Sequence, residues 1–275
     1  MEEEEELKAI LRNAFGDSSS ESDGESSHDR RGRRVRVNDS SDEIVRPLSI
    51  FGDTHTWESI TEINGLWICR DFLSVDLQSS LLSAFEKEGY LAGTSHNQAM
   101  KFGDLPPWAL ELSYIIRENV LLSGSCSESM NLVTSDSSKE SCFFPSELLW
   151  REPLFDQLIV NIYQPGEGIC AHVDLLRFED GIAIISLESS CVMHFSSVEA
   201  EANHHLEEVN RVCVVPSAKI PVLLTPGSLI LMWGEARYKW KHEINRKPGF
   251  QIWEGQEIDQ KRRTSVTLRK LCRTE

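Results

Sequence analysis

A His-x-Asp pair, followed much later by a single His, constrains this sequence more than any other feature. The pair is His172 and Asp174, and the later residue is His242. Side chains two residues apart in a β-strand lie on the same face, so the pair can converge on one ion. His242 is then expected from another strand across a barrel. Two His and one carboxylate in this order are typical of the facial triad that binds non-haem iron.

The sequence around these residues consists of short apolar runs that favour β-strands over helices. About eight such runs at short spacing predict two packed sheets, a jelly roll, in an α+β and mainly β protein with a double-stranded β-helix core. The predicted strands cover residues 158–163, 182–187, 191–195, 212–215, 221–225, 228–233, 240–244 and 264–268.

Two helices are predicted before these strands. Ser74 is suited to cap the first helix, whose apolar residues recur at helical spacing at Leu77, Leu81, Leu82 and Phe85. The second is expected from Trp108 to about Leu122, with one apolar side formed by Leu110, Leu112, Ile115 and Ile116. The polar segment at roughly 94–107 between the helices is a candidate lid.

Composition divides the chain into a tail and one folded domain. Residues 1–44 carry acidic and Ser-rich blocks with almost no apolar residues, so they are expected to be disordered. The basic run from Arg30 to Arg36 is either a nuclear-import or RNA-contacting patch or a solvated charge run. Residues 45–275 form the predicted domain, with a Ser-rich surface insertion at about 123–141.

Charge and cysteine content narrow the protein class. The net charge of −16 over 275 residues counts against tight, non-specific nucleic-acid binding. The seven Cys contain no C-x-x-C pair and indicate reduced intracellular thiols. No signal peptide and no membrane span are expected. We expect a monomer in the nucleus, the cytoplasm or both.

Further motifs surround the triad, and together they resemble the AlkB-like family of Fe(II)/2-oxoglutarate-dependent dioxygenases. The resemblance covers roughly residues 60–275. The motif sequences are most similar to those of the tRNA-hydroxylase-type AlkB homologues, whose extra domains are not expected here. The motifs are Asn161-x-Tyr163-x-Pro165-Gly166, Ser186-Leu187, Gly227-Ser228-Leu229, Gly234-x-x-Arg237-Tyr238-x-Trp240-x-His242 and Arg263-x-Ser265-x-Thr267-x-Arg269.

The resemblance implies roles for these residues. His172, Asp174 and His242 would bind Fe(II) and leave open positions for 2-oxoglutarate and O₂. Arg263 would bind the distal carboxylate of 2-oxoglutarate with help from Ser265 and Tyr163, while Arg269 would lie near the carboxylate that chelates iron, a region braced by Asn161. Arg263 and Arg269 share one side of a strand, and planar guanidinium groups suit a dicarboxylate.

The implied reaction couples oxidative decarboxylation of 2-oxoglutarate to hydroxylation of a C–H bond. Hydroxylation of an N-methyl group leads to demethylation, and hydroxylation of another carbon leaves an alcohol. Two departures from the family weaken a DNA-repair assignment. Leu176 stands where repair members carry a carboxylate that touches the base, and Glu188 stands where the backbone turns tightly.

Other candidate residues have less specific interpretations. We expect His204-His205 to lie in a solvated loop and His194 to have a structural role. Three tryptophans are expected to pack in the core: Trp233, Trp240 and Trp253. A cluster of basic residues is either a phosphate-contacting rim or a solvated edge; it comprises Arg237, Lys239, Lys241, Arg246 and Lys247.

Three hypotheses for function remain open. The leading one is a dioxygenase that demethylates or hydroxylates a nucleic acid, with RNA or tRNA favoured over DNA. The second is the same chemistry on a protein side chain, which the acidic composition permits. The third is a non-catalytic AlkB-like binding module that recruits partners through residues 1–44.

Overall fold

The computed structural model describes residues 56–90, 97–123, 144–199 and 219–273. The chain divides into two units, Met1–Thr54 and His55–Glu275, and the fold below is that of the second. Several predictions lie outside the described residues: the tail, the strand at 212–215, His204-His205 and all of the Ser-rich insertion except Ser123.

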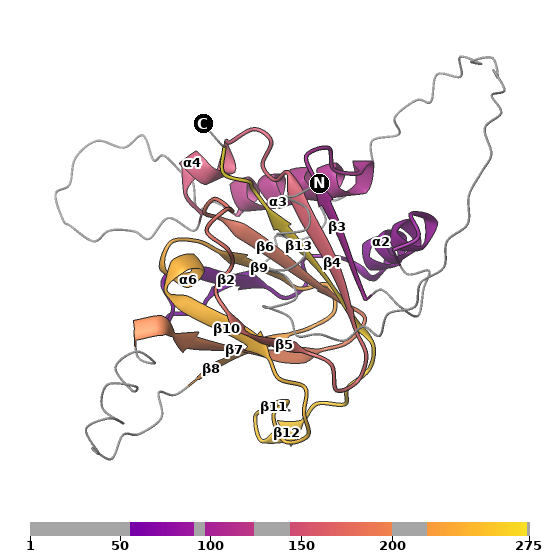
Figure 1. Cartoon of the computed structure of the whole chain (residues 1–275), viewed down its shortest axis with the longest axis vertical. Helices are drawn as coiled ribbons and strands as arrows, with labels where there is room; N and C mark the ends of the chain where they lie inside the picture. Colours follow the sequence, from indigo (N-terminus) through magenta and orange to yellow (C-terminus); the bar gives the residue numbers. More distant parts are fainter. Residues whose placement is uncertain (1–55, 91–96, 124–143, 200–218, 274–275) are drawn as a thin grey trace, which may run out of the picture. The chain divides into compact units, whose positions relative to one another are not determined.

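Two antiparallel sheets make up the domain (Figure 1). The seven-stranded sheet has the order β1 (Trp57–Ser59), β2 (Leu66–Cys69), β9 (Leu229–Met232), β6 (Ile182–Leu187), β13 (Arg263–Arg269), β4 (Gln157–Tyr163), β3 (Gln98–Phe102). The four-stranded sheet has the order β5 (Ile169–His172), β10 (Trp240–Ile244), β7 (Cys191–Ser197), β8 (Ile220–Leu224). A separate hairpin pairs β11 (Ile252–Trp253) with β12 (Gln256–Glu257).

The hydrophobic core lies between these two sheets. Ile184 and Ile230 of the larger sheet and Met193 and Phe195 of the smaller one belong to one buried cluster. Every residue of β6 and β13 is buried, so both faces of the larger sheet are covered at its centre. The smaller sheet covers one face, and the helices α2 (Val75–Lys87) and α3 (Pro107–Leu122) lie on the other (Figure 1). The predicted jelly roll is thus confirmed.

Both predicted helices are present. Ser74 caps α2, and its hydroxyl oxygen accepts a hydrogen bond from the backbone N–H of Leu77 at 3.3 Å. In α3 the prediction was wrong for Leu110, which is 50% exposed. The buried side of α3 is set by Ala109, Leu112 and Ile116, and Leu110 is turned about 100° away from Ala109. Two short helices, α4 (Ser146–Leu149) and α6 (Glu235–Tyr238), complete the described elements.

The candidate lid contains a regular strand. Gln98–Phe102 forms β3, which pairs with β4 along its whole length and forms one edge of the larger sheet. Its residues are partly buried from Gln98 to Met100 and exposed at Lys101 and Phe102. In the described ranges, no helix is both long and apolar enough to cross a membrane.

Candidate metal centre

Neighbouring strands of the smaller sheet bring the two His of the triad together. β5 and β10 are antiparallel, and their register pairs His172 directly with His242. The centroids of the two imidazole rings lie 4.3 Å apart. The expectation that His242 comes from across a barrel was therefore wrong. A directly opposed pair on adjacent strands already places two side chains within reach of one ion.

Asp174 completes the cluster from the loop that follows β5, so the expectation that it shares a strand face with His172 was wrong. One ligand atom of each of the three residues lies within 4.8 Å of the other two, and Asp174 Oδ2 lies 3.7 Å from His242 Nε2. His172 Nδ1 lies 2.8 Å from the carbonyl oxygen of Cys170. With Nδ1 as the donor in that contact, His172 presents the lone pair of Nε2 to an ion.

Local electrostatics keep Asp174 and His242 in the protonation states that a cation requires. Burial raises the pKa of Asp174, but Arg269, His242 and His172 lower it by more, so the carboxylate is ionised. Arg269 Nη2 lies 2.5 Å from Asp174 Oδ1. Burial and His172 lower the pKa of His242 to about 3, so its ring is neutral. Neutral imidazole and ionised carboxylate are the metal-binding forms.

These residues fit a bound divalent iron. Among the described residues, nothing hydrogen-bonds to the buried Oδ2 of Asp174 or to the buried Nδ1 of His242. A buried carboxylate oxygen without a donor is costly, and a cation between the three side chains satisfies it. The donor set of two imidazoles and one carboxylate is that of non-haem Fe(II) sites.

The larger sheet faces this centre with a row of polar side chains. Register places Gln98, Asn161, Ser265 and Ser186 opposite one another on four adjacent strands. Gln98 Nε2 donates a hydrogen bond to Asn161 Oδ1 at 2.6 Å. Sequence reasoning missed Gln98, because only its pairing with β4 shows that it belongs to this row.

Arg263 lies at one end of the same face. Its Nε donates to Ser186 Oγ at 3.0 Å, and its guanidinium carbon lies 5.5 Å from the centroid of the Tyr163 ring. Its Nη2 is buried without a hydrogen-bond partner in the described part of the chain. Burial raises the pKa of Tyr163, so its phenol is neutral. A buried guanidinium with an unused donor is suited to a carboxylate ligand.

The structure differs from the sequence-based view of the remaining cations. Arg269 contacts the carboxylate of Asp174 itself and also donates to Gln157 Oε1 at 3.3 Å. Arg237 and Arg246 are buried and donate to backbone carbonyls. The prediction that these two arginines belong to a phosphate-contacting rim was therefore wrong. Lys239 pairs with Glu235 at 3.0 Å.

Comparisons with known proteins agree with this geometry. The model of the 2OG-Fe(II) oxygenase superfamily matches residues 71–269, a range that includes every candidate site residue. An Arabidopsis thaliana protein described as an alkylated DNA repair protein ALKBH8 homolog is 28% identical over 232 residues, which are 78% of this chain and 60% of the relative. A Xenopus tropicalis tRNA (carboxymethyluridine(34)-5-O)-methyltransferase alkbh8 is 27% identical over 75% of this chain and 32% of its own length.

The chain thus spans less than two thirds of these relatives. Among solved structures, that of OsALKBH1 has 16% sequence identity and a TM-score of 0.47, and covers 75% of this chain and 97% of its own. The chain belongs to the 2OG-Fe(II) oxygenase superfamily, and it is accordingly a dioxygenase that uses Fe(II) and 2-oxoglutarate.

Proposed function

We propose that this oxygenase hydroxylates or demethylates a nucleic acid, and that RNA, tRNA in particular, is favoured over DNA. The observation that carries the proposal is the cluster of His172, Asp174 and His242 opposite the buried guanidinium of Arg263. A nucleic-acid substrate would place the protein in the nucleus or the cytoplasm.

In this proposal His172, Asp174 and His242 hold Fe(II). Arg263, with Tyr163 and Ser265, binds the distal carboxylate of 2-oxoglutarate, while Asn161 and Arg269 support the end near the metal. When bound, iron and 2-oxoglutarate supply the oxidation of a substrate C–H bond by O₂, with succinate and CO₂ as coproducts. The protein keeps Asp174 ionised through Arg269, orients His172 through the carbonyl of Cys170, and buries Asp174 and His242.

The preference for RNA rests on the relatives and on the surface beside the metal. One relative is described as a tRNA (carboxymethyluridine(34)-5-O)-methyltransferase, although the match covers only 32% of that protein. Leu176 follows Asp174 by two residues and is 77% exposed. Next to it, Arg177 lies over the ring of the exposed Phe102 at 5.8 Å. Apolar, aromatic and guanidinium surfaces are the ones on which unpaired bases stack.

The test is succinate formation by purified protein with Fe(II), 2-oxoglutarate and ascorbate. The substrates are an anticodon stem-loop with carboxymethyluridine at position 34, a sequence-matched single-stranded DNA with N-methylated bases, and a methylated peptide, all at one stated salt concentration. We expect the RNA to stimulate turnover most. Greater stimulation by DNA or by the peptide would reject the RNA preference.

Two histidine variants test whether turnover depends on the triad. His172→Ala should abolish turnover. His194→Gln should retain it, because His194 is paired with Glu243 and therefore lies on the opposite face of the smaller sheet from His242. Wild-type protein that binds neither metal nor 2-oxoglutarate would instead support a non-catalytic module.

A further inference from the structure

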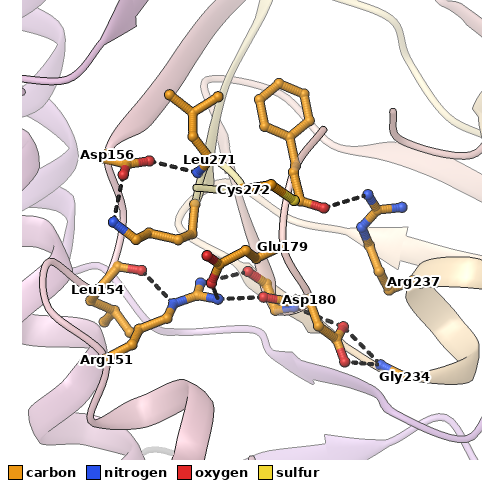
Figure 2. Close-up of polar contacts among 12 residues, drawn as sticks. Arg151, Leu154, Asp156, Glu179, Asp180, Gly234, Arg237, Leu271 and Cys272 are labelled. Atoms are coloured by element: carbon orange, nitrogen blue, oxygen red, sulfur yellow. Dashed lines mark hydrogen bonds and ion pairs between the residues drawn. The ribbon is translucent and has the colours of Figure 1, made fainter. Parts of the chain in front are cut away.

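The loop that carries Asp174 is bonded at several points to a single buried side chain. Arg237 in α6 donates from Nη1 to the carbonyl oxygen of Asp174 at 2.9 Å. From Nη2 it donates to the carbonyl oxygens of Leu175 at 2.7 Å and Phe178 at 3.2 Å. Its exposed fraction is 0%. Figure 2 shows the guanidinium directed at the loop. One planar fork thus restrains the backbone from Asp174 to Phe178.

A second contact joins the far end of this loop to the same helix. The carboxylate of Asp180 accepts the backbone N–H of Gly234 at 2.9 and 3.0 Å, and also that of Gly181 at 2.8 Å (Figure 2). Gly234 is the residue immediately before α6, and α6 leads directly into β10. The loop with Asp174 and the strand with His242 are therefore bonded to each other through a segment of a few residues.

Filling space does not account for an arginine at this position. Burial lowers the pKa of Arg237, which means that the folded environment disfavours its charge. An apolar residue of similar volume would avoid this desolvation but could not restrain three carbonyl groups. The observed contacts all fall on residues 174–178, next to the ligand, so the restraint acts where the metal site needs it.

We infer that Arg237 and Asp180 are positioning residues that hold the carboxylate of Asp174 in place relative to His242. The inference rests on the proposed metal role of the triad. Residues that orient metal ligands typically change metal affinity by about 10- to 100-fold when they are replaced. The structure assigns this function to the buried fork of Arg237 and to the bond from Asp180 to Gly234.

The experiment measures Mn(II) binding to the full-length metal-free protein by isothermal titration calorimetry, together with the thermal midpoint of each variant. Arg237→Lys keeps the charge but loses the fork, and Asp180→Asn keeps the size but weakens the bond to Gly234. Arg117→Lys is the matched control. Arg117 is a partly buried arginine that pairs with Glu152 and donates to the carbonyl oxygens of Leu149 and Arg151, none of which belongs to residues 174–180.

We expect Arg237→Lys and Asp180→Asn each to weaken Mn(II) binding by about 10- to 100-fold at a temperature where they are fully folded. Arg117→Lys should lower the thermal midpoint and leave Mn(II) binding unchanged. If Arg237→Lys does not fold, Asp180→Asn decides the question alone.

Two outcomes would overturn the inference: wild-type Mn(II) affinity in the folded variants, or an equal loss in Arg117→Lys. His172→Ala serves as the reference for the proposed function. If His172→Ala binds Mn(II) as tightly as wild type, the triad itself is wrong. If only His172→Ala loses binding, the triad stands and the positioning role fails.

Discussion

Arg263 is 1% exposed, and its surroundings within the described ranges satisfy only part of its guanidinium. Ser186 accepts from Nε, the Tyr163 ring lies alongside, and Nη2 has no hydrogen-bond partner in those ranges. A buried charged donor without an acceptor is a cost that a carboxylate ligand would remove. Substitution of Arg263 is therefore a direct test of 2-oxoglutarate binding.

Arg263→Gln should raise the KM for 2-oxoglutarate by about 10- to 100-fold, because a charged hydrogen bond contributes about 1.5–3 kcal/mol. Mn(II) binding should stay at the wild-type level. Titration of succinate formation against 2-oxoglutarate measures the effect. Arg262→Gln is the control, because Arg262 is exposed and pairs with Glu188. An unchanged KM in Arg263→Gln would remove Arg263 from the cosubstrate site.

Glu188 occupies a backbone conformation that favours glycine, with φ at 71°. Its carboxylate offsets this strain by accepting hydrogen bonds from Arg262 Nε at 2.8 Å and Thr264 Oγ1 at 2.5 Å. The departure from the family pattern at this position is thus accommodated locally, at the start of β13.

Glu188→Ala should lower the free energy of unfolding by about 1–2 kcal/mol, because it keeps the strain and loses the hydrogen bonds. Glu188→Gly should lose less, by about 1 kcal/mol, because glycine adopts this φ without strain. Urea denaturation of both variants gives the difference. Equal stability of the alanine variant and the wild type would contradict this account.

At the scale of elements, the pairing of β5 with β10 decides whether the triad forms. Gly168 immediately precedes β5, and a Cβ atom there would lie 1.9 Å from the carbonyl oxygen of Ile244 in β10. The two strands approach so closely at this point that no side chain fits between them. The same pairing holds His172 opposite His242.

Gly168→Ala should therefore separate the two strands, lowering the free energy of unfolding by about 1–3 kcal/mol and weakening Mn(II) binding. Gly166→Ala is the matched control. Gly166 has a φ of +87°, and a Cβ there meets nothing within 4 Å, so this variant introduces strain without a clash. Urea denaturation and Mn(II) titration are compared for the pair. Loss of Mn(II) affinity in Gly166→Ala alone would reverse the assignment.

At the scale of the whole molecule, the buried His242 and Asp174 make the stability of the metal-free protein depend on pH. Burial and His172 lower the pKa of His242 to about 3, whereas an unfolded His has a pKa of about 6.5. Between these values the unfolded chain binds a proton that the folded chain does not. The free energy of unfolding therefore rises with pH in this interval. The lowered pKa of Asp174 acts in the same direction at more acidic pH.

The metal-free protein should consequently lose stability as the pH falls from about 6.5 toward 3, with His242 contributing a slope of at most about 1.4 kcal/mol per pH unit. Urea midpoints in EDTA at several pH values measure this slope. His242→Gln should reduce it. A stability that increases on acidification, or a slope unchanged in His242→Gln, would show that another group dominates.

The sequence by itself determined the features that depend on local spacing. Strand alternation and the cap at Ser74 follow from backbone geometry over a few residues, and so does the shared side of Arg263 and Arg269. The strands at 182–187 and 240–244 were predicted with the bounds that the structure has. The roles of the candidate site residues stay predictions, although the structure brings the three metal-ligand candidates together.

Only the tertiary structure decided which long-range contacts each side chain makes. It paired His242 directly with His172, buried Arg237 and Arg246 against backbone carbonyls, and left Leu110 exposed. The physical reason is that register and burial depend on strands distant in sequence. The sequence near His242 does not distinguish a basic residue that faces solvent from one that donates hydrogen bonds to the loop carrying Asp174. The free energy of packing the two sheets makes that choice.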